Sequence, residues 1–474
     1  MTIADSTFED NSAGSSGGGI DSFGGFDGND GSLDIKKSTF SRNSAGSGAA
    51  IWNDAPATIA DSTFSENTAG SMGGGISQRN FTLTITNSTL ANNSSGRYGG
   101  AIDAWGTTVI LRNSTVSGNS AGRDGGAIEN YDATVKLFNS TISGNSAGRL
   151  GGAIDNWGGT VESTNATIVM NRADADGDGS GSGGGIYNYN PSSATLLNNT
   201  LLAGNLLGAA GGDSPNDLTG EDVDPAGSHN LIGDAATAGG LAHGAGGNIV
   251  GNAGSGTIDI ATVLDPNLAD NGGPTLTHAL VAGSVALNAG DNGKAVDEDG
   301  NPLVYDQRGD GFARIYGGTV DIGALEAQNL FVEIDVKPGS DPNSINLESN
   351  GLIAVAIFTT GDFDASQVDA STVLFAGAGA VHSAMEDVDG DGDLDMVLHF
   401  KVEDTTLAAL YEDLLADDVD GDGILDSNRQ ALAVSLFGET IDGEEIIGTD
   451  EVDMFFSGKA LRELLDQLAS AGVL

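Results

Sequence analysis

The chain has 474 residues and no cysteine, and its 67 acidic residues outnumber 18 basic ones, giving a formal net charge of −49 at pH 7. The lack of cysteine excludes disulfides and thiolate chemistry. The acidic balance argues against nucleic acid and anionic membranes as partners, because both are bound by basic surfaces, and it fits a soluble protein that binds cations.

The first predicted element is a repeating β-structure over residues 1–265. Blocks that begin at Thr82, Thr108 and Thr134 align without gaps, and the first reads TLTITNSTLANNSSGRYGGAIDAWGT. A fixed period in the range of about 20–50 residues indicates a stacked solenoid. Short alternating runs between Gly, Asn and Ser residues predict strands rather than helices. We therefore predict an all-β fold that begins with a right-handed parallel β-helix with three corners per coil.

Two rows of identical residues should run through this β-helix. Asparagines recur every 24–34 residues at Asn11, Asn43, Asn67, Asn93, Asn119, Asn145, Asn171 and Asn205. Stacked at the strand spacing, they should form a hydrogen-bonded amide ladder. The isoleucine that follows each glycine pair, as in Ile102, Ile128 and Ile154, should point into the core.

The repeat also supports a family resemblance. Each coil carries F-x-x-N followed by G-G-A-I, as in FEDN with GGGI (8–20), FSEN with GGGI (64–76) and VSGN with GGAI (116–128). This resembles the repeats of polymorphic outer-membrane proteins and related bacterial surface β-helices, over residues 1–205. The second coil departs from the pattern, because it reads GAAI at 48–51. The resemblance implies a secreted or cell-surface bacterial protein.

Charged and aromatic residues also follow the 26-residue step on one face. They are the arginines Arg97, Arg123 and Arg149, the acids Asp103, Glu129 and Asp155, and the aromatic residues Trp105, Tyr131 and Trp157. Aromatic rings beside acids suit sugar rings, and a repeating row suits a repeating polymer. Two other interpretations stay open: a structural ladder produced by near-identical coils, and a catalytic pair, because carboxylates about 4.8 Å apart approach the spacing of retaining glycosidases.

The next segment, 266–327, resembles the choice-of-anchor Q segment that ends many bacterial β-helices. The resemblance rests on LDPNLADNGGPTLTHALVAGSVALNAGD and DQRGDGFARIYGGTVDIGALE. An open β-helix end exposes strand edges and apolar core. We therefore expect this segment to cap the β-helix.

Residues 328–457 should form a small acidic β-sandwich-like module with calcium loops. Residues 328–474 hold 31 acidic and 5 basic residues, and their apolar runs alternate with turn signals. Two stretches fit D-x-D-G-D-G-x-x-D, a pattern of hard oxygen ligands that suits Ca²⁺ and resembles the calcium loops of integrin-type and thrombospondin-type repeats. The predicted ligands are Asp387, Asp389, Asp391, Asp393 and Asp395 in the first loop and Asp418, Asp420, Asp422 and Asp426 in the second. A third acidic run, Asp174, Asp176 and Asp178, lacks the closing acid.

The tail 458–474 should be a short helix that is too short and too charged to span a membrane. The chain opens with MTIADSTF inside a repeat, without a signal peptide, so we expect it to be a shortened form of a longer exported protein.

The leading functional prediction is a non-enzymatic secreted or surface protein. It would adhere or bind glycans, polysaccharide or a neighbouring cell surface through the β-helix face. A polysaccharide lyase or glycoside hydrolase and a purely structural spacer are the alternatives.

Overall fold

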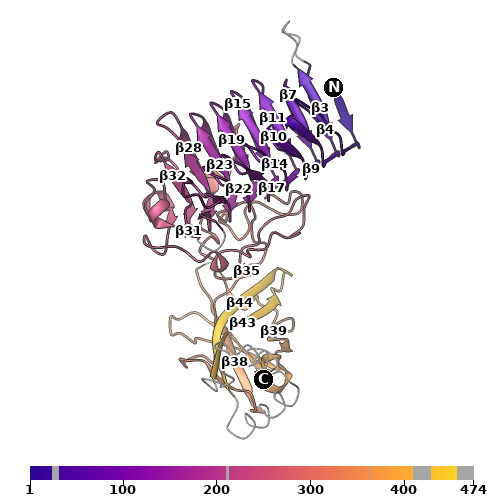
Figure 1. Cartoon of the computed structure of the whole chain (residues 1–474). Coiled ribbons are helices and arrows are strands. Elements are labelled where there is room, and N and C mark those ends of the chain that lie inside the picture. The colour runs from indigo at the N-terminus through magenta and orange to yellow at the C-terminus, as the bar shows by residue number, and fades with distance from the viewer. Residues whose placement is uncertain (24–30, 210–212, 362, 409–428, 456–474) are drawn as a thin grey trace, which may run out of the picture. The chain divides into compact units, whose positions relative to one another are not determined.

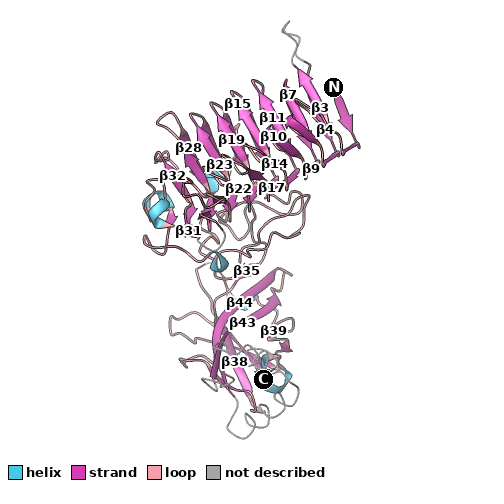
Figure 2. Ribbon diagram, viewed as in Figure 1, coloured by secondary structure: helices cyan, strands magenta, loops and turns pink. Residues whose placement is uncertain are grey.

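The computed structural model describes residues 1–23, 31–209, 213–361, 363–408 and 429–455. The chain divides into two compact units, Met1–Ala327 and Gln328–Leu474. The first unit is a parallel β-helix, seen in Figure 1 as a stack of coils. Figure 2 shows that strands make up these coils. Six single 3-10 turns lie at Ala235–Thr237, Ala245–Gly247, Ile260–Thr262, Asn292–Lys294, Ala365–Gln367 and Val402–Asp404, and among the other described residues Leu407 and Ala408 are also helical.

Four parallel sheets run the length of the β-helix, so a coil has four strands and not the three-sided outline that the sequence predicts. Sheet 1 contains β1 (Thr2–Ala4), β4 (Leu33–Lys36), β8 (Ala57–Ala60), β12 (Leu83–Thr86), β16 (Thr108–Arg112), β20 (Thr134–Phe138), β24 (Thr160–Thr164) and β28 (Ala194–Asn198). Sheet 2 contains β2 (Thr7–Glu9), β5 (Thr39–Ser41), β9 (Thr63–Ser65), β13 (Thr89–Ala91), β17 (Thr115–Ser117), β21 (Thr141–Ser143), β25 (Thr167–Val169), β29 (Leu201–Ala203), β33 (Leu231–Ile232) and β34 (Ile249–Val250).

The other two sheets complete each coil. Sheet 3 contains β6 (Ser44–Ser47), β10 (Thr68–Met72), β14 (Ser94–Ser95), β18 (Ser120–Ala121), β22 (Ser146–Ala147), β26 (Arg172–Ala173), β30 (Leu206–Leu207) and the antiparallel β31 (Ser214–Pro215). Sheet 4 contains β3 (Ile20–Phe23), β7 (Ile51–Asp54), β11 (Ile76–Arg79), β15 (Ile102–Trp105), β19 (Ile128–Tyr131), β23 (Ile154–Trp157), β27 (Ile186–Asn188) and β32 (Leu218–Gly220). Most sheet 3 strands have two residues, which is too short for an alternating pattern to reveal them in the sequence.

The predicted isoleucine row fills the lumen. Ile102 pairs with Ile128 and Ile128 with Ile154 across adjacent coils, and all three side chains are fully buried. Phenylalanines stack in the same way in the first coils, with ring centroids of Phe40 and Phe64 4.7 Å apart and parallel. One continuous apolar core therefore passes through the coils, as a solenoid requires.

The predicted asparagine ladder is confirmed. Each side-chain amide from Asn11 to Asn171 donates a hydrogen bond to the Oδ1 of the asparagine in the next coil at 2.8–2.9 Å. Asn205 donates to Oδ1 of Asp217, which ends the row. Because an amide both donates and accepts, the buried polar row satisfies its own hydrogen bonds.

The glycine pair of each repeat forms the tight corner that precedes sheet 4. Gly125 has a φ of +66°, and a Cβ there would lie 2.5 Å from the carbonyl oxygen of Ile128. A Cβ on Gly126 would lie 2.1 Å from the carbonyl oxygen of Gly152 in the next coil. Glycine is therefore needed at the first position for its backbone conformation, and at the second it allows the close stacking seen at Gly126, whereas the second coil accommodates Ala49 there.

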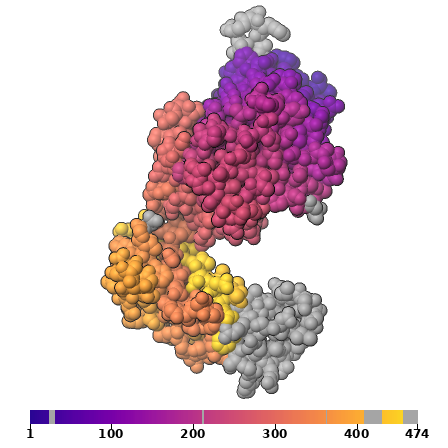
Figure 3. Space-filling view, turned by 90° about the vertical axis from the view of Figure 1, so that its left-hand side faces the viewer, coloured from indigo at the N-terminus to yellow at the C-terminus, as the bar shows by residue number. Residues whose placement is uncertain are grey.

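Residues 266–327 lie along the outer face of sheet 2, whereas the sequence predicts a cap over the end. Gln307 contacts Thr115 and Thr141, and the His278 ring is 2.8 Å from Ser143 Oγ. Val263, Leu264, Ala286 and Ile322 form a second apolar cluster with the outward residues Val169, Leu201, Ala203 and Leu231. In Figure 3 this segment, in salmon, lies against the magenta coils. At this end the lumen is covered instead by Val223, Ala235, Ala238 and Leu241.

The second unit contains two sheets around a shared apolar core, as expected for a sandwich. The four-stranded antiparallel sheet contains β36 (Ile334–Val336), β38 (Leu352–Ile357), β42 (Asp395–Lys401) and β41 (His382–Glu386). The six-stranded sheet contains β35 (Leu330–Phe331), β44 (Glu445–Phe455), β43 (Arg429–Glu439), β39 (Leu374–Phe375), β40 (Ala378–Gly379) and β37 (Ser344–Asn346). The predicted helix over 458–474 lies outside the described residues. Within the described part of the chain, no helix has the length and apolarity needed to cross a membrane.

Candidate functional site

The acids and the aromatic residues predicted from the repeat lie on the outer face of sheet 4. In β15, Ile102 and Ala104 are buried in the lumen and belong to its core, so Asp103 and Trp105 point outward. The register places Asp103 beside Glu129, Glu129 beside Asp155, and Trp105 beside Tyr131. The sequence prediction of stacked rows is therefore confirmed for the acids and for the start of the aromatic row.

The aromatic row is longer than the sequence predicts. The ring centroids of Trp105 and Tyr131 are 4.4 Å apart, and those of Tyr131 and Trp157 are 5.9 Å apart. Tyr189 continues the row, 3.6 Å from Trp157. It follows Trp157 by 32 residues and not 26, because the intervening coil carries an insertion, so a fixed-period search misses it. Trp105 is 46% exposed, so the row has a solvent-facing surface.

The acids, in contrast, are buried although they point outward. Asp103 is 2% exposed, Glu129 is 4% exposed and Asp155 is fully buried. Burial raises the pKa of Asp103, whereas the charge of Arg79 and the hydrogen bonds from Ser77 and Arg79 lower it. Burial, together with the charges of the neighbouring acids, raises the pKa of Glu129 well above its usual range, and burial raises that of Asp155 to about 8. Asp155 is therefore expected to hold a proton at neutral pH, and the protonated form of Glu129 is also favoured.

The arginines do not form the simple row that the sequence predicts. Arg149 pairs with Asp124, with 2.7 Å between Nε and Oδ1. Arg123 donates to the Tyr98 hydroxyl at 2.6 Å and lies 3.9 Å from Asp124. Arg97 is exposed and does not line the pocket described below.

Two charged residues of this site, Arg79 and Asp124, were not predicted from the sequence. Arg79 donates to Oδ2 of Asp103 at 2.6 Å, and its guanidinium lies 5.2 Å from the centroid of the Trp105 ring. Asp124 is buried and accepts from Arg149. Neither residue has a counterpart of the same kind in the adjacent coils, so the repeat gives no signal for them.

A pocket of about 350 Å³ lies on this face. Its lining residues are Met72, Tyr98, Asp103, Trp105, Arg123, Glu129, Tyr131, Arg149 and Trp157. Within the described residues, Oε2 of Glu129, both carboxylate oxygens of Asp155 and Nη1 of Arg79 are buried without a hydrogen-bond partner. Buried polar atoms are normally paired. We call this pocket, together with Asp124, Asp155 and Arg79 around it, the acid–aromatic pocket.

The first predicted calcium loop brings part of its ligand set together. One carboxylate oxygen from each of Asp387, Asp389 and Asp395 lies within 4.8 Å of the other two. Asp395 is buried and accepts hydrogen bonds from the backbone N–H groups of Thr359 and Val388. Asp391 and Asp393 do not join this group. The second loop, Asp418 to Asp426, lies outside the described residues. Asp174, Asp176 and Asp178 also form such a cluster.

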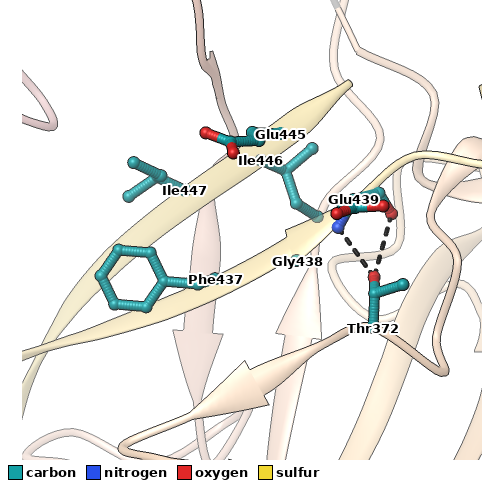
Figure 4. Close-up of a pocket in the computed structure, with 7 residues that line it drawn as sticks. All are labelled: Thr372, Phe437, Gly438, Glu439, Glu445, Ile446 and Ile447. Atoms are coloured by element: carbon teal, nitrogen blue, oxygen red, sulfur yellow. Dashed lines mark hydrogen bonds between the residues drawn. The ribbon is translucent and has the colours of Figure 1, made fainter. Parts of the chain in front are cut away.

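A second pocket, of about 250 Å³, lies in the second unit near the turn between β43 and β44 (Figure 4). The Thr372 hydroxyl accepts a hydrogen bond from the Glu439 N–H at 2.8 Å, and Phe437 is half-exposed at its edge. Glu439 and Glu445 lie opposite each other across the hairpin. We assign no ligand to this pocket, because its described polar groups do not converge on one point.

Comparisons with known proteins agree with the fold. A family described as "Right handed beta helix region" matches residues 1–147, and the parallel sheets extend the same architecture beyond them. No curated protein and no solved structure matches the chain. The β-helix is therefore right-handed, as predicted. The more specific resemblances to polymorphic outer-membrane proteins and to choice-of-anchor Q segments stay predictions.

Proposed function

We propose that this protein is a non-enzymatic, secreted or surface-located binding protein that holds a saccharide in the acid–aromatic pocket. The observation that carries this proposal is the combination of an exposed aromatic row with buried, unpartnered polar atoms in one pocket. Aromatic faces suit the apolar faces of sugar rings, and carboxyl and guanidinium groups suit their hydroxyls. Pockets with a few convergent polar groups are the usual form of small-ligand sites.

The test is a glycan array probed with wild-type protein and with the triple variant Trp105→Ala, Tyr131→Ala and Trp157→Ala. The wild type should bind a subset of glycans, and the triple variant should lose that binding while keeping its circular dichroism spectrum. Trp52→Ala is the matched control, because Trp52 lies on sheet 4 outside the pocket lining. Equal binding by the wild type and the triple variant would reject the site. A wild type that binds no glycan would favour a structural spacer.

Glycoside hydrolysis is the second candidate, and one observation favours it. Asp103 and Glu129 line the same pocket from adjacent coils, where strand spacing places them about 4.8 Å apart. Asp103 is ion-paired with Arg79, whereas burial raises the pKa of Glu129 well above its usual range and so favours its protonated form. A proton donor beside an ion-paired carboxylate resembles the arrangement of retaining glycosidases. Release of reducing sugar by the wild type and not by Glu129→Gln would establish this activity in place of simple binding.

We also propose that the second unit binds a structural Ca²⁺ ion through Asp387, Asp389 and Asp395. Three carboxylates close together repel one another unless a cation lies among them, and oxygen ligands suit calcium. Ligand that binds only the folded state stabilises it by about 2.7 kcal/mol at a hundredfold excess over Kd. Chelation should therefore lower the melting temperature of this unit, and Asp389→Asn should reduce that effect. The exposed Asp442→Asn is the control. A melting curve that is indifferent to chelator would reject the ion.

A further inference from the structure

The acid–aromatic pocket contains more buried acids than basic partners. Asp103 pairs with Arg79, and Asp124 pairs with Arg149. Arg123, the third guanidinium, is committed to the Tyr98 hydroxyl and lies near Asp124. Among the described residues, Glu129 and Asp155 have no basic partner within ion-pair distance. Two adjacent carboxyl groups are therefore left over, and Glu129 lines the pocket.

Ionised carboxylates cannot satisfy one another as stacked amides do, and these two carboxyl groups hydrogen-bond to each other only by sharing a proton, with Glu129 as donor and Asp155 as acceptor. An ionised carboxylate only accepts hydrogen bonds. When both groups are ionised, Glu129 Oε2 and the Asp155 oxygens accept none from the described residues. Burial and the charges of Asp155, Asp124 and Asp103 raise the pKa of Glu129, and a cation bound beside it would take the place of a proton. The group that would complete this cluster is a hydrogen-bond donor with a positive charge.

We infer that the saccharide bound here carries a free amine, whose ammonium group contacts Glu129, beside Asp155 of the next coil, while the sugar face lies against the aromatic row. This inference rests on the proposed saccharide binding. An ammonium group offers three donors, and its hydrogen bonds to a carboxylate are charge-assisted. The nearby rings also favour a cation, as the position of Arg79 beside Trp105 shows. A metal ion is disfavoured, because the only other carboxylate in the lining, that of Asp103, is paired with Arg79, and the rest of the lining is rings, guanidinium groups and Met72.

The experiment compares three β-1,4-linked tetramers of equal length, made of glucosamine, N-acetylglucosamine or glucose, by titration calorimetry at pH 6 in 0.15 M salt. The glucosamine tetramer should bind wild-type protein at least tenfold more tightly than the other two. Glu129→Gln should bind all three with the affinity that the wild type has for the neutral tetramers. Titrations in two buffers of different ionisation enthalpy should show net proton release with the wild type and little with Glu129→Gln. Asp155→Asn should also weaken the preference.

The variant also distinguishes a specific site from general attraction of an amine to an acidic protein. Glu129→Gln removes at most one charge from a formal net charge of −49 and replaces the side chain with one of similar shape. General attraction would survive this change almost undiminished, and that result would overturn the inference. Competition by an equal concentration of CaCl₂ would assign the site to a metal ion and would also overturn it. Equal binding of all three tetramers to the wild type would overturn the amine preference but support saccharide binding. Failure of every tetramer, together with an empty glycan array, would reject both proposals.

Discussion

The buried acid row should make the β-helix more stable in mild acid, and Asp155→Asn tests this by removing one member of the row, together with the charge that it places beside Glu129. Burial raises the pKa of Asp155 from its ordinary value of 3.8 to about 8. A carboxyl group with a raised pKa in the folded state stabilises the fold fully below pH 3.8, and that contribution is lost as the pH rises through 8. Between pH 5 and 7 the folded state therefore holds a proton that the unfolded state lacks. The free energy of unfolding falls by about 1.4 kcal/mol for each pH unit.

Over the range from pH 5 to pH 7 this amounts to about 3 kcal/mol from Asp155 alone. Asparagine cannot ionise, so the difference in unfolding free energy between wild type and Asp155→Asn should change by that amount across the range. Urea unfolding at pH 5, 6 and 7, followed by far-ultraviolet circular dichroism, measures it. The exposed Asp222→Asn is the control and should follow the wild type. If the wild type and Asp155→Asn differ by the same free energy at every pH, Asp155 is ionised in the folded protein and the reasoning is wrong.

Two further substitutions test the interior of the coils. Ile128→Asp places an unpaired charge in the fully buried lumen, so it should lower the free energy of unfolding by more than about 4 kcal/mol and prevent the β-helix unit from folding. Its control is Ile128→Val, which should lower the free energy of unfolding by about 1 kcal/mol. Asn119→Ala interrupts the amide ladder and leaves the Asn93 amide without its acceptor, so it should lower the free energy of unfolding by about 3 kcal/mol. In contrast, Asn252→Ala, at an exposed position of the same unit, should have little effect.

The repeat made the architecture predictable because a solenoid turns sequence period into spatial register. Once the 26-residue step is recognised, Asn119 must lie over Asn93, and Ile128 must lie over Ile102. The structure confirms both pairs. Glycine pairs locate the corners for the same reason. The fourth side of the coil escaped prediction, because strands as short as Ser120–Ala121 leave no alternating pattern.

The site was only half predictable, because its chemistry depends on what differs between the coils. Arg79 occupies the position that Trp105 occupies one coil later, and from there it reaches Asp103. Asp124 occupies the position of Tyr98 and of Leu150 in the neighbouring coils. Burial of the acids was also hidden, since sequence alternation assigns them to the outer face but does not show what covers that face. Segment 266–327 was misplaced for a similar reason: its partners, such as Thr115 and Thr141, carry no signal in the sequence.

The asparagine row and the acid row of this β-helix differ in how their members interact, and this difference indicates that the acid row has a role beyond folding. Near-identical coils produce rows automatically, and a row of asparagines stabilises the stack because each amide donates to the next. A row of carboxylates does the opposite, because each member only accepts and repels its neighbours when ionised. Asp103 is neutralised by Arg79, but Glu129 and Asp155 depend on protons or on a bound cation. Asparagine or serine at either position would fold with less cost, so the acids are better explained by a ligand than by the stack.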